Sequence, residues 1–135
     1  MSPRRIDHTA IVVRDMDEAL ARYAALFGLA PSLRRLIPDQ RVEVAFLLLG
    51  DTELELIQPT DSTSGVARFL DQRGEGFHHI ALAVDDIRRE LKALEELGIQ
   101  LIDREPRRGA HGAVAFLHPK ATGGVLVELV EREPE

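Results

Sequence analysis

The chain has 135 residues, enough for one domain of ordinary size or for two small halves that share a core. Hydrophobic residues make up 44% and charged residues 30%, a composition typical of a globular protein and not of a disordered one. The net charge of −6 and the lack of a basic patch argue against nucleic acid as a partner. The sequence contains no cysteine, which excludes disulfides, thiolate metal sites and a cysteine nucleophile.

The sequence shows no targeting or membrane signal. The N-terminal residues MSPRRIDHTA lack the apolar core of a signal peptide, and no apolar run approaches the length of a membrane span. We therefore expect a soluble, cytoplasmic protein without a membrane partner. The acidic balance does not exclude an anionic substrate, because local Arg and Lys residues can still line a pocket.

In the first half, apolar periodicity and turn signals predict a strand, a helix and three further strands. Asp15 is a typical helix N-cap because Glu18 follows as its capping-box partner, and Gly28 is a typical helix end. The expected elements are a strand at 6–13, a helix from 15 to 28, a strand within 29–38, strands at 41–49 and 52–59, and a short helix near 66–72.

The second half repeats this order. GEGFHHIALAVDD at residues 74–86 alternates as a half-buried strand does, and a helical pattern follows until Gly98 ends it. The expected elements are a strand at 77–84, a helix at 86–97, a short strand at 100–103, an Arg-rich loop at 104–112, and strands at 113–118 and 125–131. Each half therefore has the order βαβββ, which predicts an internal duplication.

Each half places one histidine on its first strand and one glutamate on its last. His79 follows His8 by 71 residues and Glu128 follows Glu55 by 73, so the two pairs occupy matched positions. Two imidazoles and two carboxylates suit a divalent ion such as Zn, Co, Ni, Mn or Fe(II). A single strand histidine is more often a core or edge residue, and it is the repetition that favours a metal site. His78 points to the face opposite His79 and is not expected to be a ligand.

The order βαβββ–βαβββ, with its His…Glu…His…Glu series, resembles the vicinal oxygen chelate superfamily. That superfamily includes glyoxalase I, extradiol dioxygenases, fosfomycin-resistance proteins and methylmalonyl-CoA epimerases. Three segments are similar to the epimerases: IDHTAIVV at 6–13, GEGFHHIALAVDDI at 74–87, and VAFLHPKATGGVLVELVE at 114–131. Together with DSTSGVARFL between the first two, they extend the resemblance over nearly the whole chain.

The resemblance implies an α+β fold in one vicinal oxygen chelate domain, residues 1–135. Two tandem βαβββ modules, residues 5–60 and 77–131, would form an open, cupped, eight-stranded mixed sheet with the metal inside. Because unpaired strand edges between modules are a liability, we also expect a homodimer.

The family's ligand positions map onto His8, His79 and Glu128, and its fourth position maps onto Glu55. The resemblance therefore implies one divalent ion per chain, with Co, Zn, Mn and Ni as the candidates. It also suggests an acid/base glutamate on the preceding strand, which is Glu43 in RVEVAF. Glu43 and Glu128 are then the candidate proton carriers on the two faces of the substrate, and an exposed strand glutamate is the alternative interpretation of Glu43.

The implied activity is epimerisation of methylmalonyl-CoA at C2, by proton removal and return through a metal-stabilised enolate, as part of propionate metabolism. An acyl-CoA thioester is then the small-molecule partner, with Arg107, Arg108 and Lys120 as candidate contacts that more often are solvated surface. The alternatives are a glyoxalase I-type hemithioacetal isomerase (a lactoylglutathione lyase) and a metal-free binding module. The intact His/Glu quartet argues against the binding module, and the fourth ligand, Glu55, argues against a three-ligand dioxygenase.

Overall fold

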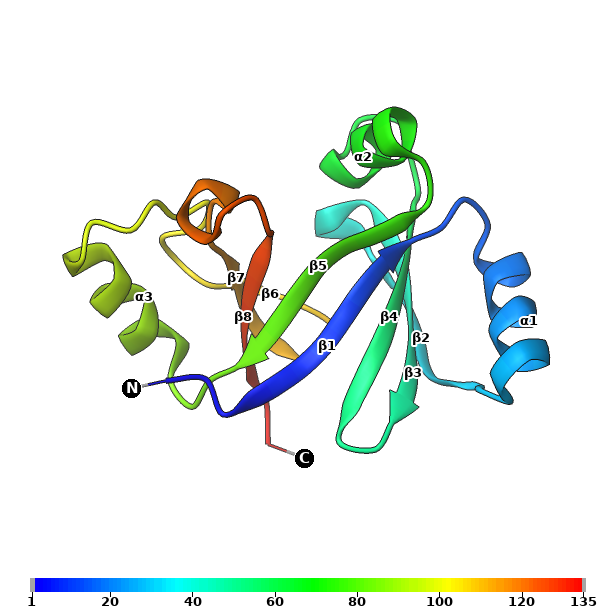
Figure 1. Ribbon diagram of the computed structural model, residues 1–135, viewed down its shortest axis with the longest axis horizontal. Coiled ribbons are helices and arrows are strands. Elements are labelled where there is room, and N and C mark those ends of the chain that lie inside the picture. Colours follow the sequence, from blue (N-terminus) through cyan, green and yellow to red (C-terminus); the bar gives the residue numbers. More distant parts are fainter. Residues whose placement is uncertain (1, 135) are drawn as a thin grey trace. The chain divides into compact units, whose positions relative to one another are not determined.

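The computed structural model describes residues 2–134, which form eight strands, three α-helices and two 3₁₀ helices (Figure 1). The strands are β1 (Arg5–Val12), β2 (Pro31–Ile37), β3 (Val42–Leu49), β4 (Thr52–Pro59), β5 (Gly76–Ala83), β6 (Arg107–Arg108), β7 (Gly112–Phe116) and β8 (Val127–Arg132). The helices are α1 (Met16–Phe27), α2 (Gly65–Arg73), α3 (Ile87–Glu96), and the 3₁₀ helices η1 (Pro38–Gln40) and η2 (Pro119–Thr122). Among residues 2–134, no helix combines the length and apolar character that crossing a bilayer requires.

The strands are hydrogen-bonded in the order β2-β3-β4-β1-β5-β8-β7-β6. β5 and β8 pair in parallel, whereas β2–β3, β3–β4, β6–β7 and β7–β8 pair antiparallel. This mixed eight-stranded sheet with its helices confirms the predicted α+β fold class. The chain divides into two compact units, one of residues 9–78 and one of the residues up to His8 together with those from His79 onward. β1 and β5 each contribute residues to both units.

In the unit of residues 9–78, α1 begins and ends where the sequence predicts. The Asp15 side chain accepts a hydrogen bond from the Glu18 backbone N–H at 2.9 Å, and Gly28 ends the helix in the left-handed conformation. The apolar face of α1 packs on β3 and β4, in a core of Val13, Met16, Ala19, Ala45, Leu47 and Leu56. This packing fixes which face of β3 and β4 is covered by the helix.

In the other unit, α3 lies against β7 and β8 (Figure 1). Asp86 caps the helix by accepting from the Arg89 N–H, and the Glu131 carboxylate accepts from the Ile87 N–H at 2.9 Å. The core under the helix comprises Val84, Ile87, Leu91, Ala115, Leu117 and Leu129. Helix α3 thus covers the face of β8 to which Leu129 and Glu131 point.

The second half departs from the prediction between its helix and β7. The expected strand at 100–103 is not formed, and only Leu101 makes an isolated bridge, with Leu117. The N–H groups of Ile102 and Asp103 both donate to the Phe116 carbonyl, at 3.0 and 3.1 Å, which interrupts a regular ladder. The second strand of this half is instead β6, within the segment predicted to be an Arg-rich loop.

Gly112 begins β7 at a point where the chain runs very close to β8. Its φ is +154°, and a Cβ atom would lie 2.2 Å from the Glu131 carbonyl oxygen. We expect Gly112→Ala to lower the free energy of unfolding by about 2 kcal/mol or more, because strain and a backbone clash add together. Urea denaturation followed by circular dichroism measures this change.

Gly65→Ala is the matched control, because a Cβ there meets nothing closer than the Arg68 side chain at 3.9 Å. It lies in the first turn of α2, and we expect its stability to stay within about 1 kcal/mol of the natural chain or to rise. Equal losses in the two variants would contradict the close approach at Gly112.

Candidate metal centre

The two histidines meet because β1 and β5 run side by side in opposite directions (Figure 1). The Arg4 N–H donates to the Ala83 carbonyl at 2.9 Å. In an antiparallel pair a step forward on one strand matches a step back on the other, so His8 comes to face His79. Their Nε2 atoms lie 3.4 Å apart, and both side chains are buried.

Glu128, on β8, places its carboxylate beside the two histidines. It pairs in register with Ala81, which shares a face of β5 with His79. The Glu128 Oε1 atom lies 3.0 Å from His8 Nε2 and 3.3 Å from His79 Nε2, and the glutamate is 6% exposed. Phe116, the β7 partner of Glu128, packs edge-on against the His79 ring with centroids 5.1 Å apart. The structure therefore brings together three of the four predicted metal ligands.

A fourth group, Asp7, supports this cluster and was not identified from the sequence. Its Oδ2 atom lies 2.7 Å from His8 Nδ1, and its Oδ1 atom accepts from Arg132 Nε at 2.6 Å. Burial alone would raise the pKa of the Asp7 carboxyl, but the bonds to His8 and Arg132 hold it well below its usual range. Asp7 is thus a buried, ionised acceptor for His8. Its only signal in the sequence is an acidic residue beside a strand histidine.

The ligand atoms present lone pairs to one another. A neutral His8 that donates Nδ1–H to Asp7 has a lone pair at Nε2. Among residues 2–134, Glu128 Oε1 is one of the buried side-chain atoms without a hydrogen-bond partner. Burial raises the pKa of the Glu128 carboxyl, and hydrogen bonds from His79 and His8 lower it wherever those rings carry a proton on Nε2. Converging lone pairs in a buried place are the signature of a cation site.

The spacing of these atoms also fits a metal ion. Two ligand atoms bound to one ion at about 2.1 Å, with angles between about 90 and 110°, lie about 3.0–3.4 Å apart. The separations among His8 Nε2, His79 Nε2 and Glu128 Oε1 are 3.0, 3.3 and 3.4 Å. Nitrogen and carboxylate donors in this number suit a borderline divalent ion. The residues present therefore fit the predicted metal.

The remaining predicted residues, Glu55 and Glu43, lie in the unit of residues 9–78. Glu55 on β4 is buried and pairs with Phe46, whereas Glu43 on β3 pairs with Gln58. Strand alternation places Glu43 on the face that α1 covers and Glu55 on the other face. Arg34 holds the Glu43 carboxylate in a two-pronged ion pair at 2.9 and 3.3 Å. The structure thus separates these two glutamates by the thickness of the sheet.

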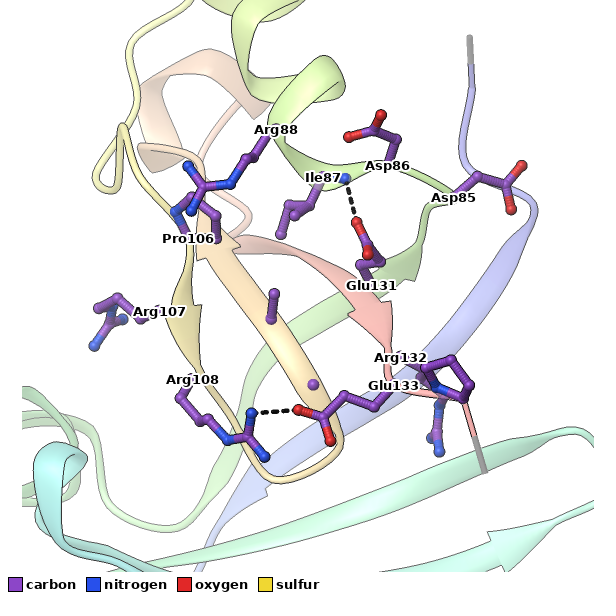
Figure 2. Close-up of a pocket in the computed structure, with 13 residues that line it drawn as sticks. Asp85, Asp86, Ile87, Arg88, Pro106, Arg107, Arg108, Glu131, Arg132 and Glu133 are labelled. Atoms are coloured by element: carbon purple, nitrogen blue, oxygen red, sulfur yellow. Dashed lines mark hydrogen bonds and ion pairs between the residues drawn. The ribbon is translucent and has the colours of Figure 1, made fainter.

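A cavity of about 590 Å³ lies beside the start of α3 (Figure 2), and no histidine is among its lining residues. Figure 2 shows the Glu131 carboxylate directed at the Ile87 N–H. Strand alternation places Glu128 on the other face of β8. The arginines that line the cavity are all engaged in ion pairs: Arg88 with Glu105, Arg107 with Asp103, Arg108 with Glu133, and Arg132 with Asp7. Arg107 and Arg108 therefore lie at this second cavity with their guanidinium groups already paired.

Comparison with known proteins identifies the family of this chain. Residues 7–116 match the model of the Glyoxalase/Bleomycin resistance protein/Dioxygenase superfamily. The human mitochondrial methylmalonyl-CoA epimerase is 41% identical over 127 residues, which cover 93% of this chain and 72% of that protein. An ethylmalonyl-CoA/methylmalonyl-CoA epimerase from Cereibacter sphaeroides is 40% identical over 128 residues, covering 93% of this chain and 96% of the relative.

A solved structure of a methylmalonyl-CoA epimerase in complex with methylmalonyl-CoA and NH₄⁺ superposes with a TM-score of 0.93. It is 35% identical, and the match covers 98% of this chain and all of the other. The family model covers most of the chain, and the relatives match it over nearly its whole length. The chain therefore belongs to the Glyoxalase/Bleomycin resistance protein/Dioxygenase superfamily and, within it, to the methylmalonyl-CoA epimerase family.

Proposed function

We propose that this protein interconverts the R and S forms of methylmalonyl-CoA at C2 with the help of one divalent metal ion. The observation that supports the metal most directly is the convergence of His8 Nε2, His79 Nε2 and Glu128 Oε1 within 3.4 Å of one another. The named relatives support the substrate, because they are epimerases of this thioester. Glu55, from the other unit, is the fourth ligand in this proposal.

The reaction removes the proton between a thioester and a carboxylate and returns it to the opposite face of the carbon. A divalent ion at this site supplies Lewis-acid stabilisation of the negative charge that develops on the substrate oxygens. His8 and His79 contribute neutral nitrogen donors, and Glu128 contributes the one anionic donor of the three. Their burial keeps bulk water away, which strengthens every electrostatic interaction at the site.

The second part of the proposal concerns the groups that carry the proton on the two faces of the substrate carbon. Glu128 and Glu43 are the candidates. Metal coordination lowers the basicity of Glu128, so it can act as a base only if substrate binding loosens it from the metal. Glu43 is paired with Arg34 and lies on the face of β3 that α1 covers, opposite Glu55, so it can carry a proton to the substrate only if both its pairing and its position change. The native metal (Co, Zn, Mn or Ni), the homodimer, the cytoplasmic location and the role in propionate metabolism stay predictions.

Proton exchange at C2 tests the activity itself. We expect metal-loaded protein in D₂O to introduce deuterium at C2 of methylmalonyl-CoA, because a proton taken by a side chain exchanges with solvent before its return. Proton NMR follows the loss of the C2 signal, and protein treated with a chelator is the control. The hemithioacetal of methylglyoxal and glutathione is run in parallel. Formation of lactoylglutathione without exchange of the CoA ester would replace the epimerase by a glyoxalase.

His79→Ala tests the metal centre, with the neighbouring His78 as its matched control. We expect His79→Ala to weaken metal affinity by more than about 100-fold and to abolish turnover, because direct ligands matter more than outer-shell residues. His78 packs edge-on against Phe69 at 4.9 Å, so His78→Ala should keep the metal. Isothermal titration with Co²⁺ or Zn²⁺ measures both variants. Equal affinities in the two variants would exclude His79 as a ligand.

Glu43→Gln tests the proposed proton carrier. We expect unchanged metal affinity and a turnover reduced by about 10²-fold or more, the usual size of a general acid–base contribution. Asp17→Asn is the control, because Asp17 shares Arg34 with Glu43 through a 2.7 Å ion pair. A loss caused only by disturbing Arg34 would appear in both variants, and full activity of Glu43→Gln would remove Glu43 from the mechanism.

A further inference from the structure

The two histidines of the metal centre are supported in different ways. His8 directs its Nδ1 atom at the Asp7 carboxylate, 2.7 Å away, and Asp7 is completely buried. His79 instead packs against the apolar ring of Phe116. The duplicated halves thus match in the type of ligand and differ in what lies behind it.

Both oxygens of Asp7 are engaged. Its Oδ1 atom accepts from Arg132 Nε at 2.6 Å and from Arg5 Nη2 at 3.3 Å. Its Oδ2 atom lies near His8 Nδ1 and accepts from Arg132 Nη2 at 3.2 Å. A carboxylate held at both oxygens cannot rotate away, so it is a rigid acceptor for His8.

We propose that Asp7, held in place by Arg132, is a positioning residue that fixes His8 with its Nε2 lone pair toward the metal. The inference rests on the proposed metal site and goes beyond it. A neutral imidazole has one N–H, and an acceptor at Nδ1 draws that proton to Nδ1. Nε2 then carries the lone pair that can bind an ion, and the same bond to Asp7 blocks rotation of the ring.

Arg132 connects this arrangement to a distant part of the sequence, because it lies 125 residues after Asp7. It follows Glu128 by four residues on β8, so it points to the same side of the strand. One strand therefore supplies a metal ligand and the arginine that secures the support of another ligand. Figure 2 shows the Arg132 side chain extending away from Glu131, whose carboxylate is directed at α3.

Metal affinity is the first test. We expect Asp7→Ala to weaken Co²⁺ binding about 10- to 100-fold, the range typical of residues behind a metal-bound histidine. Glu131→Ala is the matched control: it removes an acidic side chain that caps α3 on the other face of β8, and should lower stability while leaving Co²⁺ affinity unchanged. Competition against a chelator at one fixed pH measures affinity. No loss in Asp7→Ala, or equal losses in both variants, would overturn the inference.

Two further variants separate positioning from general destabilisation. Asp7→Asn keeps an acceptor oxygen for His8 and should recover most of the affinity that Asp7→Ala loses. Arg132→Met should weaken Co²⁺ binding on its own and have no further effect when Asp7 is already alanine, because the arginine acts through Asp7. Additive losses in the double variant would show that Arg132 acts independently, which would contradict the proposed arrangement. If Asp7→Ala fails to fold, Asp7→Asn and the single variant Arg132→Met still test the inference.

The tautomer of the His8 imidazole is measured in the metal-free protein. In ¹⁵N–¹H correlation spectra, the metal-free natural chain should show His8 protonated at Nδ1 only, and Asp7→Ala should lose that preference. Any other pattern in the natural chain would overturn the inference. If the natural chain binds no Co²⁺, the metal proposal fails by itself, and this spectrum then decides whether Asp7 orients His8.

Discussion

The constraint on which this site depends is electrostatic. Two imidazole nitrogens and a carboxylate oxygen lie within 3.4 Å of one another where almost no water reaches. Electron pairs so close repel strongly in a medium of low dielectric constant, and burying a polar atom without a partner is costly. A protein retains such an arrangement where a cation joins the atoms. The unpartnered Oε1 of Glu128 is therefore better explained as a ligand than as a defect of the core.

Rigid strands make this arrangement possible. His8, His79 and Glu128 all lie within hydrogen-bonded strands and not in loops, so their backbone positions are fixed by the ladders of β1, β5 and β8. On β8 the two faces have separate tasks. Glu128 and Arg132 point toward the histidine side, while Glu131 points to the other side and caps α3. The alternation of one strand thus serves both the site and the attachment of its helix.

Local rules explain which elements were predictable. The strands that carry the histidines and the helix capped by Asp15 follow from alternation and capping, which depend on neighbours in the sequence. The expected strand at 100–103 does not form because other hydrogen bonds replace the ladder there. The N–H groups of Ile102 and Asp103 share the Phe116 carbonyl, and the Phe116 N–H donates to the Asp103 carboxylate. No periodicity reveals such a contact.

The same distinction holds within the site. The candidate ligands His8, His79 and Glu128 could be predicted because a duplication repeats residue types at matched positions, a signal that one sequence contains. The support of His8 was not found, because Asp7 and Arg132 lie 125 residues apart and neither has a counterpart in the other half. The side of the sheet on which Glu43 lies needed the packing of α1 on β3 before it could be assigned.

The duplication therefore constrains the two halves unequally. A metal requires a donor atom of a given kind at a given distance, so the ligand histidines are held to the same identity in both halves. What lies behind a ligand needs only to restrict its orientation, and a buried ion pair or an aromatic ring can do so. His8 is oriented by charge through Asp7, and His79 by contact with Phe116. The carboxylate of Asp7 raises the electron density of the His8 imidazole, whereas the ring of Phe116 restricts the orientation of His79. An ion bound at the proposed site would therefore face two differently supported nitrogen donors, although both are supplied by histidines.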